Sequence, residues 1–279
     1  MKLGYSGKKI ISLMKVKKEG DAKGKGQKSL RPKTQVVAIT SGKGGVGKTN
    51  IVANLGFSIS QLGKRVLIFD ADLGLGNLDI MLGITPRYNL SHVIAGKKRM
   101  ADITLDGPGN LKILPAASGI QELTELKEEQ RGRILDEFNL LTHSIDVLLI
   151  DTASGISSNV VYFSNAADEI VVVVSPEPTS ITDAYALMKV LSLRYSRRKF
   201  KLLINLVRDP EESYEVFSQL SVVTDRFLDI SVDYLGYILF DQNITKCIKL
   251  QKVVTEVFPY TKASRCFSLL ANKICSPDF

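Results

Sequence analysis

A glycine-rich stretch at residues 41–50, SGKGGVGKTN, brings four glycines, two lysines and a threonine together. Its spacing fits G-x-x-x-x-G-K-[ST], in which backbone amides turn toward phosphate oxygens and the next helix adds its positive end. Lys48 would reach the β- and γ-phosphates of a nucleotide, and the Thr49 hydroxyl would coordinate Mg²⁺. The predicted nucleotide-contacting residues of this loop are Gly42, Gly44, Gly45, Val46, Gly47, Lys48, Thr49 and Asn50.

Three aspartates stand at the ends of two further apolar runs. Asp70 and Asp72 belong to DADLGLGNLDIMLG, and Asp151 ends DVLLID. The carboxyl ends of parallel strands meet at one edge of a sheet, where ligands bind. Carboxylates at that edge can hold Mg²⁺ and position an attacking water. The alternative is a surface turn that uses Asp and Gly for turn chemistry alone.

Short apolar runs alternate with helical patterns from residue 35 onward. The runs are continuous and rich in Val and Ile, as in parallel strands buried on both faces. We therefore predict one α/β domain over 35–279, with a doubly wound, mainly parallel sheet flanked by helices. The predicted strands lie at 34–40, 65–70, 111–116, 146–151, 169–175, 199–205 and 235–240. The predicted helices lie at 50–62, 120–142, 180–194 and 211–227.

Charge is concentrated at the N-terminus. Residues 1–34 hold eleven Lys or Arg against Glu19 and Asp21, which leaves 26 basic and 27 acidic residues in the rest of the chain. This Lys- and Gly-rich arm is predicted to be disordered, either as a solvated leader or as an electrostatic arm. The three cysteines match no metal or disulfide spacing and no signal or membrane-spanning run is present, so we expect a cytoplasmic protein.

The additional lysine, Lys43, extends the glycine-rich motif to K-G-G-V-G-K-T. This signature resembles the deviant Walker A ATPases, the family of MinD, ParA and the nitrogenase iron protein. The resemblance implies a P-loop fold that binds ATP and Mg²⁺ and forms a homodimer when ATP is bound. In that dimer Lys43 would cross the interface to the partner's nucleotide, where its charge would stabilise the closed pair.

The resemblance also assigns roles in hydrolysis, which is expected to be slow without a stimulating partner. Asp72 would orient the attacking water, Asp70 would support the magnesium shell, and Asp151 would contact Mg²⁺ through water. Asn77 and Asp79 would lie near the first switch and the dimer interface. The second switch would be residues 152–155, which read Thr-Ala-Ser-Gly where many relatives carry a proline or another glycine.

Recognition of the base rests on the segment LLINLVRDP. Its Asn205 occupies the position where the family reads adenine, with Arg208 nearby. An asparagine at the end of a strand is more commonly a cap or a turn former.

Three segments resemble MinD-like proteins of the FlhG type: TSGKGGVGKTNIVANLG, DADLGLGNLDIMLG and the stretch from DQNITK to SRCFSLL. Proteins of this type are ATPases that control flagellar number and placement with the flagellar GTPase FlhF. The resemblance covers residues 35–275 and implies that function and a partner of the FlhF type. The N-terminal motif D-Q-A-x-x-L-R of many relatives is absent. A ParA-like DNA-partitioning ATPase is the alternative, with RYSRRKFK at 194–201 as its candidate DNA-binding patch.

Membrane association depends on the C-terminus. An amphipathic helix is expected at about 262–275, with Phe267, Leu270 and Ile274 on one apolar stripe between basic residues. Related proteins use such helices to reach the membrane, which implies a peripheral location at the inner face of the cell membrane. The same pattern also describes a terminal helix that packs permanently on the domain, and the sequence leaves both possibilities open.

Overall fold

The computed structural model describes residues 34–117, 119–120, 123–141, 144–277 and 279. The predicted basic arm, residues 1–34, lies outside the described residues except for Thr34. The strands are β1 (Gln35–Ser41), β2 (Val66–Ala71), β3 (Leu105–Asp106), β4 (Lys112–Leu114), β5 (Val147–Ser154), β6 (Glu169–Val174), β7 (Lys199–Val207) and β8 (Ser231–Leu239).

Helices connect these strands. They are α2 (Lys48–Gln61), α3 (Leu78–Met81), α4 (Leu90–Ile94), α5 (Met100–Ile103), α6 (Glu128–Leu141), α7 (Ser158–Ala166), α8 (Pro178–Tyr195), α9 (Pro210–Leu228), α10 (Gln242–Lys249), α11 (Val254–Val257) and α12 (Lys262–Ile274), with a 3₁₀ turn, η2, at Pro108–Asn110.

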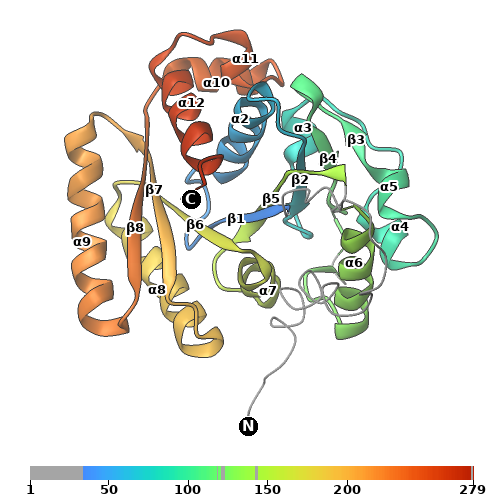
Figure 1. Cartoon of the computed structure of the whole chain (residues 1–279), viewed down its shortest axis with the longest axis horizontal. Helices are drawn as coiled ribbons and strands as arrows, with labels where there is room; N and C mark the ends of the chain where they lie inside the picture. The colour runs from blue at the N-terminus through green and yellow to red at the C-terminus, as the bar shows by residue number, and fades with distance from the viewer. Residues whose placement is uncertain (1–33, 118, 121–122, 142–143, 278) are drawn as a thin grey trace, which may run out of the picture.

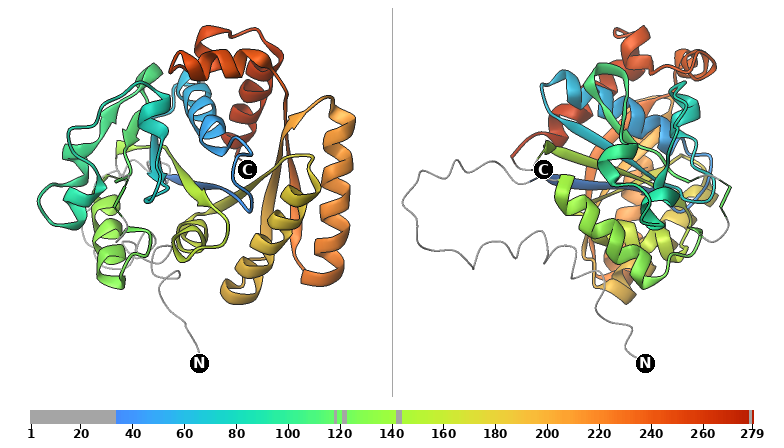
Figure 2. Two further views of the ribbon diagram at one scale, coloured as in Figure 1. Left: turned by 180° about the vertical axis from the view of Figure 1, so that it is seen from behind. Right: turned by 90° about the vertical axis from the view of Figure 1, so that its right-hand side faces the viewer.

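Over the described part of the chain, the strands form one sheet in the order β3-β4-β2-β5-β1-β6-β7-β8 (Figure 1). Every neighbouring pair is parallel except β3 with β4. Helices α2, α10, α11 and α12 cover one face, and α6, α7 and α8 cover the other (Figures 1 and 2). The predicted doubly wound α/β fold is confirmed.

The apolar strands are continuous because both of their faces are buried. Successive side chains of a strand point to opposite faces. In β1, Val37 and Ile39 belong to the core under α2 and α12, whereas Val36 and Ala38 belong to the core under α6 and α7. β1 is buried on both faces because it lies inside the sheet, between β5 and β6. The loop that follows β1 therefore lies at the edge formed by the carboxyl ends of the parallel strands.

Helix α12 packs on the domain. Phe267 and Ile274 are fully buried and Leu270 is 2% exposed, in the same core cluster as the inner face of α2. Its end is also tied to the sheet, because Lys273 Nζ donates to the Leu235 carbonyl at 2.7 Å and Gln35 Nε2 donates to the Ile274 carbonyl at 3.1 Å. The apolar stripe is therefore part of the core in this structure, as the second possibility describes, and membrane association stays a prediction.

The basic run at 194–201 is largely engaged in structural contacts. Arg197 donates to the backbone carbonyls of Asn165 and Ala167, and burial lowers its pKa. Arg198 donates to the Leu228 and Asp229 carbonyls at 3.1 and 3.0 Å. These two guanidinium groups thus bind backbone carbonyls at the ends of α7 and α9, whereas Arg194 and Lys199 are exposed. DNA binding by this run stays a prediction.

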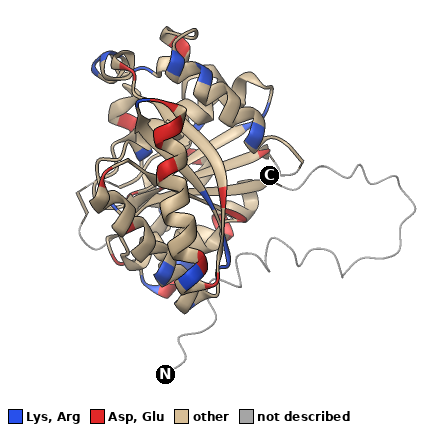
Figure 3. Cartoon of the chain, turned by 90° about the vertical axis from the view of Figure 1, so that its left-hand side faces the viewer, with Lys and Arg blue, Asp and Glu red and all other residues tan. Residues whose placement is uncertain are grey.

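Acidic and basic residues are interspersed over the folded part of the chain (Figure 3). This agrees with the near balance of charges outside the N-terminal arm. None of the helices that the structure describes has both the length and the apolar character needed to cross a bilayer.

Candidate nucleotide site

The glycine-rich loop joins the end of β1 to the start of α2. Gly45 and Gly47 have φ values of +80° and +86°, which favour glycine because other residues are strained there. A Cβ on Gly42 would lie 2.1 Å from the backbone oxygen of Asp183 in α8. The loop therefore needs glycine both to turn and to pack against α8. The turn leads directly into the N-terminus of α2, whose unpaired amides suit an anionic ligand.

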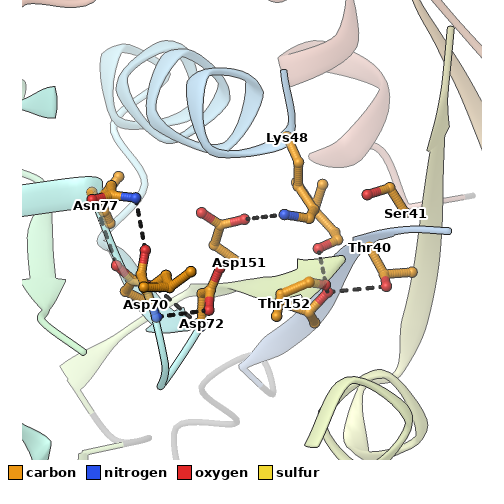
Figure 4. Close-up of polar contacts among 12 residues, drawn as sticks. Thr40, Ser41, Lys48, Asp70, Asp72, Asn77, Asp151 and Thr152 are labelled. Atoms are coloured by element: carbon orange, nitrogen blue, oxygen red, sulfur yellow. Dashed lines mark hydrogen bonds and ion pairs between the residues drawn. The ribbon is translucent and has the colours of Figure 1, made fainter. Parts of the chain in front are cut away.

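Lys48 faces a carboxylate at the neighbouring strand end. Its Nζ lies 3.7 Å from Oδ1 of Asp151, and the two side chains are 10% and 1% exposed (Figure 4). Burial raises the pKa of Asp151, while the charge of Lys48 and the Thr49 hydroxyl oppose that shift. Lys48, the half-buried Thr49 and the buried Asp151 thus form one polar cluster, of the kind that the sequence predicted for a site of phosphate and Mg²⁺.

Asp70 lies beside Asp151, because β2 and β5 pair in register at these two residues. The Asp70 carboxylate accepts hydrogen bonds from the backbone amides of Asp72 and Leu78, at 3.1 and 3.3 Å. Burial and the nearby charge of Asp151 nevertheless raise the pKa of Asp70 well above its usual value. A Cβ at Gly76 would lie 2.7 Å from Asp70 Oδ2, so this turn wraps closely around the carboxylate.

The donor set fits a magnesium ion. Oδ1 of Asp151 is buried and has no partner within hydrogen-bond distance, since the Lys48 ammonium lies 3.7 Å away, so it has acceptor capacity for a cation. Burial raises the pKa of both Asp70 and Asp151, and the charge of Asp151 adds to the shift of Asp70, so a bound cation would favour the ionised carboxylates. Oxygen ligands from one or two carboxylates and a hydroxyl, completed by phosphate oxygens, are what Mg²⁺ prefers.

Asp72 starts the loop between β2 and α3. It is half-buried, and its Oδ1 accepts a hydrogen bond from the Leu75 amide at 3.2 Å. Asn77 donates to the Leu75 carbonyl at 2.7 Å, and Asp79 accepts from the Ile80 amide within the first turn of α3. The loop thus holds Asp72 at the same edge as Asp70 and Asp151 (Figure 4).

Lys43 is directed away from Lys48 and Asp151. Its ammonium group forms an ion pair with Glu177 and donates to the Thr179 hydroxyl at 2.8 Å. Both partners lie at the start of α8, and the two charged side chains are 34% and 58% exposed. The sequence did not predict Glu177 or Thr179 as neighbours of this lysine, because they lie more than 130 residues away along the chain.

The buried threonines next to the site tie β5 to β1. Thr152 Oγ1 lies 3.0 Å from the Thr40 hydroxyl and 3.3 Å from the Ile39 carbonyl (Figure 4). Gly155, at the end of the predicted second switch, donates its amide to the Ser41 carbonyl at 2.9 Å. The second switch therefore begins on a fixed strand and meets the glycine-rich loop at its other end.

The residues assigned to the base have different surroundings. Asn205 is 5% exposed, and its Nδ2 donates to the Val46 carbonyl at 2.8 Å, so it braces the glycine-rich loop. Arg208 is exposed and pairs with Glu212 at 2.9 Å. The structure thus brings Asn205 to the loop but leaves Arg208 on the surface at the start of α9. Adenine recognition by either residue stays a prediction.

One buried polar connection was missed in the sequence. Asn54, in the middle of α2, is fully buried and donates to the Asn50 carbonyl at 2.9 Å. Its Oδ1 accepts from the Thr255 amide and hydroxyl at 3.2 and 3.1 Å. Asn54 thereby links Asn50, at the start of α2, to Thr255 of α11. A polar residue on an otherwise apolar helix face was the available signal.

Comparisons with known proteins agree with this geometry. A family model described as an AAA domain matches residues 34–204. Antiactivator FleN of Pseudomonas aeruginosa is 45% identical over 89% of this chain and 88% of that protein. The flagellum site-determining protein YlxH of Helicobacter pylori is 33% identical over 87% and 82%.

A solved structure of the MinC:MinD cell division protein complex of Aquifex aeolicus superposes with a TM-score of 0.68. It is 28% identical and covers 86% of this chain and 96% of that one. The family model extends from the glycine-rich loop through the strands that carry Asp70 and Asp151, and the match to FleN covers 89% of the chain. The chain belongs to the MinD/ParA family of P-loop ATPases, in the FlhG-type group that includes FleN and YlxH.

Proposed function

We propose that this chain is an ATP-dependent dimerising switch that regulates the number or placement of flagella. The observation that carries the proposal is the polar cluster of Lys48, Thr49 and Asp151, with Asp70 and Asp72 at the same edge of the sheet. This arrangement has the cation, the hydroxyl and the carboxylates that binding and hydrolysis of ATP require.

In the proposed reaction, Lys48 and the loop amides bind the phosphates of ATP. Thr49, Asp70 and Asp151 would hold Mg²⁺, which when bound offsets the charge of the phosphates. Asp72 would orient the attacking water and accept its hydrogen bond. Its half-buried carboxylate is held from one side by the Leu75 amide, which leaves the other oxygen for water. Hydrolysis is proposed to be slow until a partner fixes this loop.

Dimerisation is proposed to place Lys43 against the nucleotide of the partner subunit. The ion pair of Lys43 with Glu177 does not oppose this movement strongly, because exposed pairs contribute about 0–1 kcal/mol. A lysine held at the surface by a weak pair can exchange Glu177 for a phosphate at little cost. Lys43 is therefore proposed as the residue that makes closure of the dimer depend on ATP.

The flagellar role is inferred from the relatives. FleN is named an antiactivator and YlxH a flagellum site-determining protein. By the same inference, a GTPase of the FlhF type is the proposed partner. The protein would act in the cytoplasm and, in part, at the inner face of the cell membrane. Association with DNA is the less favoured alternative, because Arg197 and Arg198 are used in backbone contacts.

Two measurements on the same variants test the proposal. Asp72→Asn should lower the rate of phosphate release from Mg-ATP by about a hundredfold or more, since positioned proton transfer contributes about 10²–10⁴. The control, Asp225→Asn, removes an exposed carboxylate of α9 and should leave the rate unchanged. In cells that lack the wild-type copy, only the control should restore normal flagellar number. Normal flagellation with Asp72→Asn would contradict the proposal.

A further inference from the structure

We propose that α10 and the turn that follows it form a docking surface for an anionic lipid bilayer. This α10 surface consists of Lys246, Ile248, Lys249, Leu250 and Lys252. The inference rests on the proposed function and deepens it, because it names the surface through which the protein would reach the membrane.

Apolar and basic side chains share this surface. Ile248 and Leu250 are 43% and 59% exposed, and Lys246, Lys249 and Lys252 are all exposed. Within the part of the chain that the structure describes, no ion pair involves any of the three lysines. The surface therefore presents two aliphatic side chains among three lysines that form no ion pair with the described residues.

Few acidic groups lie near these lysines. Asp106 and Glu256 line a hollow together with Lys252, and Asp106 is already paired with Lys112. The only carboxylate between residues 240 and 252 is Asp241, which is 8% exposed. Asp241 caps α10 by accepting from the Asn243 amide at 2.9 Å, and it also accepts from the Ala263 amide. Its charge is thus directed into the fold, and the outer side of α10 remains basic.

The α10 surface is also accessible to a bilayer. Cys247 is fully buried and anchors the inner side of α10, so that its outer side faces away from the sheet. The segment with α10 and α11 projects at the top of the molecule, where basic residues and one acidic stretch are seen (Figures 2 and 3). A bilayer accepts a projecting helix whose apolar tips enter the interface while lysines remain at the level of the headgroups.

A bilayer fits this chemistry better than the C-terminal helix does. The large apolar side chains of α12 are already committed to the core, whereas Ile248 and Leu250 are available without any unfolding. Each lysine near an anionic membrane adds about 1 kcal/mol, or about a factor of five in binding. Two aliphatic tips and three lysines give weak binding by one chain, which two chains in a dimer would strengthen.

The α10 surface is joined to the nucleotide site. Gln251, between Leu250 and Lys252, donates its side-chain amide to the carbonyl of Ile80 at 2.7 Å. Ile80 belongs to α3, in the segment that begins with Asp72. A movement of this segment would therefore be transmitted to the turn that carries Leu250, which links membrane binding to the state of the site.

Co-sedimentation of the full chain with vesicles tests the proposal. The vesicles contain equal parts of phosphatidylglycerol and phosphatidylcholine, or phosphatidylcholine alone. Leu250→Ser should weaken binding to the anionic vesicles about five- to twentyfold, because part of a leucine no longer enters the interface. Lys249→Gln should weaken it about fivefold. The matched controls on α8, Leu193→Ser and Lys189→Gln, replace exposed residues of the same types and should bind as wild type.

Each outcome decides the proposal. Loss with both α10 variants, and with neither control, supports it. It is overturned by unchanged binding of the α10 variants, by equal loss in the controls, or by equal binding to uncharged vesicles. Loss with Lys249→Gln alone would also overturn it, because binding would then be electrostatic adsorption to the headgroups without entry of Leu250 into the interface. Phosphate release measured without vesicles keeps failure of this inference separate from failure of the proposed ATPase.

Discussion

The position of α12 in the core makes a quantitative prediction about two residues of that helix. Phe267 is fully buried against α2 and β8, whereas Leu269, two residues later, is 67% exposed. Replacing a buried Phe by Ala costs about 3–5 kcal/mol from lost transfer free energy and the cavity that remains. Leu269→Ala removes a side chain that is mostly in water, so we expect it to change the free energy of unfolding by less than about 0.5 kcal/mol.

Equilibrium unfolding in urea, followed by circular dichroism, measures the change in the free energy of unfolding for both variants. Thermal unfolding, followed by the same signal, gives their Tm. For a domain of this size, 1 kcal/mol corresponds to about 2–4 °C in Tm, so Phe267→Ala should lower the Tm by roughly 6–20 °C. Leu269→Ala should have the Tm of the wild type. If both variants unfold within about 1 kcal/mol of wild type, α12 does not form part of the core, and the C-terminal helix becomes available to a membrane again.

Further predictions concern the nucleotide site. Gly42→Ala should lower the stability by about 1–3 kcal/mol and weaken ATP binding, measured by titration, because a Cβ has no room beside the Asp183 carbonyl. Glu177→Gln should leave the Tm within about 2 °C of wild type, since it removes only an exposed pair with Lys43. Burial raises the pKa of Asp70 in the folded protein above its ordinary 3.8. At a pH between 3.8 and the raised pKa, the folded protein therefore binds more protons than the unfolded chain. Its stability without Mg²⁺ should therefore fall as the pH rises through that window, and Asp70→Asn should flatten the decline in urea titrations at several pH values. An equally steep decline in Asp70→Asn would assign the pH dependence to other groups.

The sequence predicted the central strands because their burial on both faces leaves a simple pattern. The runs that became β1, β2 and β5 are continuously apolar and end at the residues of the candidate site. The short elements β3 and α3 were missed, since two to four residues cannot establish a period.

The candidate site was predictable where neighbours in sequence do the chemistry, and less so where they meet only in the fold. Lys48 and Asp151 follow from local motifs, whereas Glu177 beside Lys43 depends on how α8 starts next to the glycine-rich loop. The contacts of Arg197 could not be predicted from the sequence either. A basic run looks the same whether its guanidinium groups reach solvent or backbone carbonyls.

The amphipathic stripe of α12 could not be assigned from the sequence, because an apolar face suits a membrane and a core equally well. The buried Phe267 resolves this ambiguity only when the fold supplies α2 as its partner.

The mass of the protein in solution tests the central claim most directly. Asp72→Ala should bind ATP without hydrolysing it, and light scattering after size exclusion should then give twice the 30.7 kDa mass of the chain in Mg-ATP and the single mass in Mg-ADP. Adding Lys43→Ala should return the protein to the single mass in Mg-ATP. A protein that binds Mg-ATP and stays monomeric, or a dimer that does not need Lys43, would contradict the proposed switch.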